Sequence, residues 1–182
     1  MKIILYIFTA VFLTVSACVY TIKEYEDLYL LIGNINGDVI MRIALICAAI
    51  CMIIIAVIAI VRKENGRVLK TVICLAFSGA MLCCVGISSF LSNTYTYYDF
   101  TSPDGKHTVI AGEWSWLQGG GVNFYERTNL IFVERIGNFS TDDGYEPIKN
   151  GDYSVVWNDN EMTFTANNGN MVYETLNIVA GN

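Results

Sequence analysis

The chain has 182 residues, of which 54% are hydrophobic and 15% charged, and its formal net charge is −6. Soluble domains average about 45–50% apolar and about 25% charged residues, so this composition disfavours a simple soluble enzyme. The acidic balance disfavours nucleic-acid binding, which needs clustered lysine and arginine. Residues 1–91 carry 5 acids and 7 bases, whereas residues 92–182 carry 12 acids and 4 bases. We therefore expect a membrane domain at 1–91 and an acidic polar domain at 92–182.

Three apolar segments without a charged residue occupy 3–22, 43–61 and 71–91. A hydrocarbon core about 30 Å thick is crossed by about 20 helical residues, and a spanning segment in lipid must satisfy its own backbone groups. The sequence therefore predicts three transmembrane helices in a multi-pass protein of the cell membrane. The alternative, buried helices of a soluble protein, is disfavoured by the hydropathy of three such segments.

The positions of lysine and arginine set the expected orientation. Lys2 precedes the first segment, and the link 62–70 between the second and third segments carries four basic residues. Basic links remain in the cytoplasm, so the N-terminus and this link are expected inside the cell. The link 23–42 and the domain after residue 91 are then extracytoplasmic.

The first apolar segment has a second interpretation. The stretch Val15-Ser16-Ala17-Cys18 resembles the bacterial lipobox, in which a signal peptide is cleaved before a lipid-modified cysteine. The apolar run continues past Cys18 to Ile22, which suits a full span better. Lipidation at Cys18 and a retained first span both stay open.

Small residues recur at helical spacing in the second and third segments. Ala44 and Ala48 lie on one face of the second helix, and Gly79 and Ala80 belong to a similar stripe on the third. Small side chains let helices approach closely in lipid. We expect these residues to pack the two helices together as an antiparallel hairpin, and the alternative is an interface between copies of the chain.

Residues 92–182 contain short strand-like runs separated by Gly, Asn and Asp, and none of the six cysteines. This spacing predicts a small extracytoplasmic antiparallel β-domain, either a sandwich or a partly open barrel. The fold class is thus membrane α plus β, with three transmembrane helices followed by a β-domain that disulfides do not stabilise. The expected strands are 94–101, 106–113, 128–136, 153–157, 161–166 and 171–179.

The most unusual passage of the β-domain is rich in aromatic residues and glycine. Trp114 and Trp116 share a face if the stretch is a strand, three glycines follow at 119–121, and Tyr125 comes soon after. The glycines give either a flexible loop or a close approach of the backbone. The functional interpretation is an aromatic platform for a sugar ring or a partner. The alternative is that the tryptophans fill the core or sit at the membrane surface.

Acidic residues and the lone histidine are weaker candidates. Asp142 and Asp143 lie in a turn-like stretch, and their carboxylate oxygens are candidates to contact a bound molecule or Ca²⁺. The alternating spacing of a calcium-binding loop is absent. His107 is the only histidine, and the exported part has no cysteine to accompany it. We therefore predict no catalytic residue, no metal and no cofactor.

Four short motifs carry a resemblance to a known group of proteins. They are SPDGK at 102–106, DDGY at 142–145, GDY at 151–153 and Trp157. This pattern resembles a family of small, uncharacterised bacterial membrane-anchored proteins of unknown function. The resemblance implies a location in the bacterial envelope, and it gives no catalytic residue to transfer.

The expected function is non-enzymatic: binding or sensing at the cell envelope, or service as an accessory subunit of a membrane complex. The expected partners are the lipid bilayer and either another membrane protein or a cell-wall polymer. The alternatives are a wall-active hydrolase that uses two carboxylates and a component of a small membrane transporter. The transporter is disfavoured because no central charge marks a path through the spans.

Overall fold

The computed structural model describes residues 2–25, 28–62, 65–91, 94–116, 119–169 and 173–181. The chain divides into two compact units. The helical unit contains Met1–Glu26 and Ile35–Ser92, and the β unit contains Asp27–Asn34 and Asn93–Asn182. The division differs from the expected boundary at residue 91, because a short segment between the first two helices belongs with the β unit.

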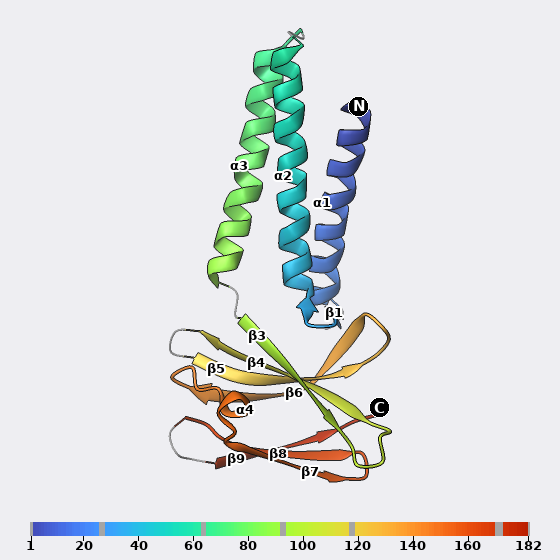
Figure 1. The fold of residues 1–182 in the computed structure, drawn as a ribbon, viewed down its shortest axis with the longest axis vertical. Helices are drawn as coiled ribbons and strands as arrows, with labels where there is room; N and C mark the ends of the chain where they lie inside the picture. Colours follow the sequence, from blue (N-terminus) through green and yellow to red (C-terminus); the bar gives the residue numbers. More distant parts are fainter. Residues whose placement is uncertain are drawn as a thin grey trace. The chain divides into compact units, whose positions relative to one another are not determined.

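Three long helices make up the helical unit: α1 (Lys2–Tyr25), α2 (Gly37–Val61) and α3 (Arg67–Leu91) (Figure 1). Each is long and apolar enough to span a membrane, which confirms the prediction of three such helices. The start of α2 is fixed by Asn36, whose side-chain oxygen accepts a hydrogen bond from the Val39 amide at 3.0 Å, as an N-cap residue does.

The helices pack through faces of different chemistry. On α2 the buried residues include Ala44 and Ala48, as expected. On α3, Gly79 and Ala80 are exposed and do not belong to the face packed within this chain, and nothing lies within 4 Å of a Cβ built on Gly79. The alternative, an interface between copies of the chain, stays a prediction. The buried face of α3 is the neighbouring stripe that includes Cys74, Ser78 and Met81.

A serine of this stripe contacts the neighbouring helix. The Ser78 hydroxyl lies 2.8 Å from the Cys74 carbonyl of its own helix and 3.3 Å from the Ala49 carbonyl of α2. The hydroxyl is thus satisfied within its own helix and also lies close to a backbone oxygen of the helix packed against it. Small size alone does not decide which stripe is buried.

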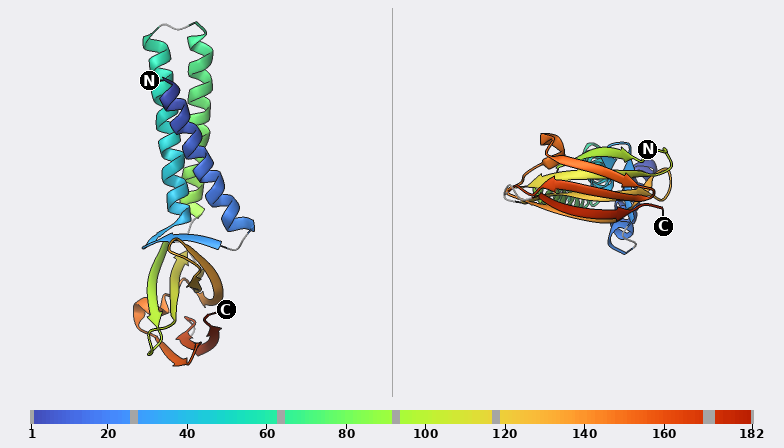
Figure 2. Two further views of the ribbon diagram at one scale, coloured as in Figure 1. Left: turned by 90° about the vertical axis from the view of Figure 1, so that its right-hand side faces the viewer. Right: turned by 90° about the horizontal axis from the view of Figure 1, so that it is seen from below.

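The strands form two antiparallel sheets, and the β unit contains all of them except the edge strand Ile35–Asn36, together with one short helix. The larger sheet has the order β2-β1-β6-β5-β4-β3 and curls into a half-barrel, and the smaller has the order β7-β8-β9. Seen from below, the strands of the two sheets run in roughly the same direction (Figure 2). The elements are β1 (Leu28–Ile32), β2 (Ile35–Asn36), β3 (Thr94–Thr101), β4 (Thr108–Trp116), β5 (Gly119–Arg127), β6 (Phe132–Asp142), α4 (Pro147–Asn150), β7 (Tyr153–Asn158), β8 (Glu161–Asn167) and β9 (Tyr173–Val179).

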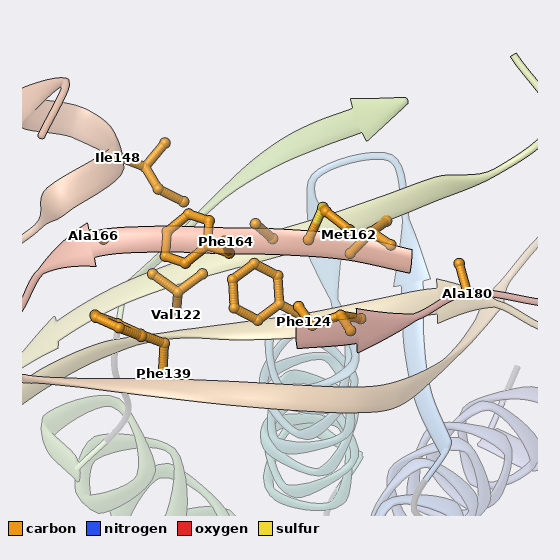
Figure 3. Packing of buried hydrophobic residues seen from close by; sticks show 11 residues of the cluster. Val122, Phe124, Phe139, Ile148, Met162, Phe164, Ala166 and Ala180 are labelled. Carbon is orange, nitrogen blue, oxygen red and sulfur yellow. The ribbon is translucent and has the colours of Figure 1, made fainter. Parts of the chain in front are cut away.

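The main core of the β unit is built from residues of both sheets (Figure 3). Phe164 of β8 is fully buried, and its ring centroid lies 4.9 Å from that of Phe124 and 5.5 Å from that of Phe139. Both contacts are edge-to-face, the arrangement that aromatic rings favour. The antiparallel β architecture and the three helices together confirm an α plus β fold.

Three strands of the larger sheet were not predicted, namely β5 and the strands β1 and β2 of the link between the first two helices. β5 begins with the three glycines at 119–121, for which the two expectations were a flexible loop and a close approach of the backbone. A Cβ on Gly121 would lie 2.5 Å from the Phe139 carbonyl oxygen, so the close backbone approach is the expectation that holds. β6 also starts later than the expected 128–136 and runs from Phe132 to Asp142.

Candidate binding face of the β unit

The larger sheet has a second face, opposite the main core, and its residues alternate with the core residues along each strand. On β4, Val109 and Ala111 belong to the main core, so Trp114 and Trp116 project from the other side. We call this side the aromatic face and define it by Tyr95, Tyr97, Trp114, Trp116 and Asn123.

Strand register gathers the predicted tryptophans and one predicted aspartate at one end of this face. Trp116 pairs with Gly119, and Gly119 pairs on its other side with Asp142. One row further in, Trp114 lies between Tyr95 and Gly121. The sequence prediction therefore named residues of two strands, β4 and β6, that the fold brings to one surface.

Glycines occupy the backbone positions directly beneath the aromatic rings. A Cβ added to Gly112 would lie 3.0 Å from Cε1 of Tyr97, 3.2 Å from Cε2 of Tyr125 and 3.3 Å from Cδ1 of Tyr95. Three tyrosine rings therefore converge over one backbone position that carries no side chain. At Gly121 the ring of Trp114 lies close to the backbone, since an added Cβ would lie 3.4 Å from its Cζ2 atom.

The rings of the face are ordered and only partly covered. The rings of Tyr95 and Tyr97 are stacked, with centroids 5.9 Å apart and an interplanar angle of 15°. Trp116 is 38% exposed, while Tyr95, Tyr97 and Trp114 are half-buried. Packing against neighbours fixes the rings in place, so little rotamer entropy remains to be lost when a flat ligand binds.

Polar groups lie among the rings. The Asn123 side-chain amide approaches the Tyr95 hydroxyl at 3.5 Å. Its neighbour on β6 is Asn138, and Ser140 pairs with Gly121 one row away; both are exposed. Around Asn123 the face thus combines apolar rings with uncharged amide and hydroxyl groups, which suit a neutral polar ligand, and the Asp142 carboxylate lies at its Trp116 end.

Tyr125 supports the aromatic face and does not line it. Only 4% of its surface is exposed, and it forms a small cluster with Leu31, Ile110 and Val133. Its ring meets Tyr29 edge-on at a centroid distance of 5.4 Å. Burial raises the pKa of the Tyr125 hydroxyl well above its ordinary value, so the phenol stays protonated near neutral pH.

The two predicted aspartates have different environments. Asp142 is exposed at the end of β6, where its amide donates to the Asn168 carbonyl at 2.8 Å. Asp143 follows in the turn with φ of 51°, a conformation that aspartate tolerates through local hydrogen bonding. Within the described ranges, no group of three or more His, Cys, Asp and Glu side chains is arranged to hold a metal ion.

A buried carboxylate was missed by the sequence prediction. Glu113 is 1% exposed, and its two oxygens accept hydrogen bonds from the backbone amides of Ile148 at 2.7 Å and Lys149 at 3.1 Å. Burial raises the pKa of Glu113, and the two amides oppose that rise. The signal that could have found it is a charged residue at a core-facing position of an alternating strand. Its role is to hold α4 against the sheet.

Cys18 is an exposed residue within the continuous helix α1. Nothing in the fold of the described residues decides between lipidation there and a retained span, so both stay predictions.

Comparison with known proteins adds no homologue: no family model matches the sequence, and no curated protein or solved structure matches it. The resemblance to small bacterial membrane-anchored proteins stays a prediction. The function is therefore argued from the geometry of the aromatic face.

Proposed function

We propose that this chain is a membrane-anchored, non-enzymatic binding protein of the bacterial envelope, and that its aromatic face binds a neutral saccharide of an envelope polymer. The observation that carries the proposal is the convergence of ordered rings over glycine backbone positions, flanked by uncharged amide and hydroxyl groups. A sugar ring has an apolar C–H face and a rim of hydroxyl groups. Such a ligand packs on aromatic rings while its rim bonds to the polar neighbours.

The charge of the β unit supports a neutral ligand. Residues 92–182 carry 12 acids and 4 bases, and a surface of this sign repels anionic polymers. Anionic wall polymers therefore fit the proposal less well than uncharged glycans do.

The spacing of acids on the aromatic side supports binding over hydrolysis. Of the described residues on this side of the sheet, Asp99 and Asp142 carry carboxylates. Across the sheet, Asp99 lies level with Ile110 of β4 and Asp142 lies level with Trp116 of β4. Six strand residues separate those two positions on β4, which is about 20 Å at about 3.3 Å per residue. Glycosidase carboxylates stand about 5–9.5 Å apart, so these two do not form such a pair.

Strand pairing also supports the proposed topology, with a cytoplasmic N-terminus and 62–70 link and an extracytoplasmic β unit. β1 comes from the link between α1 and α2, and it pairs with β6 of the C-terminal part. Two segments of one sheet must lie on the same side of a membrane. The lysine and arginine distribution independently assigns both segments to the outside.

The test is saccharide binding by the full-length chain in lipid nanodiscs. The probe is a neutral oligomer of β-1,4-linked N-acetylglucosamine, measured by calorimetry, with an anionic teichoic acid as comparison. Trp116→Ala is expected to weaken binding at least tenfold, since removal of an aromatic anchor costs about 2 kcal/mol or more and about 1.4 kcal/mol is tenfold.

The matched control is Tyr173→Ala, which removes an aromatic side chain that is 61% exposed on the smaller sheet. It should leave binding unchanged. Equal losses in the two variants would overturn the proposal. So would a stoichiometric membrane-protein partner recovered by crosslinking with no saccharide binding, a result that would favour the accessory-subunit role.

A further inference from the structure

A cavity lies at the end of the helical hairpin formed by α2 and α3, far along the chain from the aromatic face. Its volume is about 520 Å³, and it is lined by Ile60, Arg67, Val68, Thr71 and Val72. The volume is within the range of about 300–1,000 Å³ typical of small-molecule sites.

The lining has an apolar side and a polar end. Ile60, Val68 and Val72 are more than half exposed on the helix surface, so one side of the cavity is open and apolar. Arg67 supplies a guanidinium. Thr71 contributes a hydroxyl oxygen that is buried and has no hydrogen-bond partner among the described residues.

The charged residues that the structure describes around the cavity are basic, and Glu64 of the same link lies outside the described residues. Arg62 and Arg67 are exposed, and neither forms an ion pair with any described residue. The first turn of α3 contains no acidic residue, so nothing there offsets the partial positive charge of the helix N-terminus. An anion at this end of the hairpin would meet a guanidinium and the backbone amides of a helix start.

We infer that this cavity binds an anionic phospholipid, with the phosphate beside Arg67 and the first turn of α3 and an acyl chain along Ile60, Val68 and Val72. The inference rests on the membrane anchoring of the proposed function. A free phosphate would use the polar end alone, whereas the open apolar side matches a ligand that reaches the cavity from the bilayer. Juxtamembrane basic residues attract anionic headgroups in this way.

The experiment is native mass spectrometry of the full chain released from nanodiscs that contain phosphatidylglycerol and phosphatidylcholine. The wild type should retain phosphatidylglycerol in preference. Arg67→Gln should lower that retention about fivefold, the factor for about 1 kcal/mol per basic residue near a lipid surface. Val72→Phe keeps every charge but fills the cavity, and it should lower retention as well.

Two control variants match these changes. Lys106→Gln removes an exposed charge in the β unit, and Val11→Phe enlarges a side chain on α1 that is 49% exposed; both should behave as the wild type. Equal retention of the two lipids, or equal effects of Arg67→Gln and Lys106→Gln, would overturn the lipid site. Equally strong competition by soluble glycerol phosphate would overturn it too. A chain that fails to enter nanodiscs would overturn the membrane anchoring itself, and the site with it.

Discussion

Replacement of Leu31 by alanine tests whether the strand between the first two helices stabilises the β unit. Leu31 is 2% exposed and packs with Ile110, Tyr125 and Val133. Its amide also donates to the Ile131 carbonyl at 2.8 Å. Buried leucine to alanine changes cost about 2.7–5.0 kcal/mol in a closed core. This small cluster lies on the open side of the sheet and can relax, so we expect the lower end, about 2–3 kcal/mol.

The assay is thermal unfolding of the full chain in detergent, followed by tryptophan fluorescence. All three tryptophans lie after residue 92, so the signal reports the β unit alone. A domain of this size loses about 4–8 °C per kcal/mol, which gives an expected decrease in Tm of about 10–20 °C. The control is Ile32→Ala on the same strand, where the side chain is 48% exposed. Equal Tm values for the two variants would refute the assignment of β1 to the folded β unit.

Three further predictions use the same logic of matched variants. Burial raises the pKa of Glu113. The stability linked to this group is therefore fully present below the ordinary carboxyl pKa of about 4.3 and is lost as pH rises through the raised pKa. Glu113→Gln should flatten this decline in Tm between pH 4 and 8, and an unchanged slope of Tm against pH would contradict the prediction. Gly121→Ala places a Cβ 2.5 Å from a backbone oxygen and should cost about 1–3 kcal/mol by urea unfolding, whereas Gly119→Ala, with its nearest atom at 3.8 Å, should cost little. Ala48→Leu at a fully buried site of α2 should loosen the packing of the helices and speed thiol labelling of Cys74, followed by peptide-resolved mass spectrometry. Ala80→Leu on the exposed side of α3 should leave the labelling rate unchanged. Equal labelling rates in the two variants would reverse our assignment of the packed face.

The three helices were predictable because a helix long and apolar enough to span a membrane is defined by length and composition alone. About 20 apolar residues in succession are sufficient to define one, and no distant contact is needed. The packed face of α3 was not predictable in the same way. Its sequence holds two adjacent stripes of small residues, one through Gly79 and Ala80 and one through Cys74 and Ser78. The two stripes differ in their contacts with α2, such as that of Ser78 with the Ala49 carbonyl, and these contacts are not visible in the local pattern.

The candidate binding face was predicted in part for a similar reason. Trp114 and Trp116 share a face by the simple alternation of a strand, which depends only on local geometry. The glycines at 119–121 have low strand propensity, and the reason for a strand there is the backbone of β6 close beside them. Tyr125 was placed with the tryptophans by proximity in sequence. The packing of Leu31 and Tyr29 from β1 against it explains its burial, and such a contact is not visible in a local pattern.

The position of β1 in the chain has a consequence for how the β unit forms. Strands β3 to β6 follow one another and pair as neighbouring hairpins, so their contacts are local and close quickly. β1 pairs with β6 across about 100 residues that include α2 and α3. Such a non-local pairing carries a larger loop-closure cost, so the edge of β6 is covered last. A chain cut at residue 92 keeps the hairpins but leaves that edge and Val133 without Leu31, and unpaired strand edges promote aggregation. The β unit is therefore defined by pairing across the helical unit and not by the C-terminal half of the sequence alone.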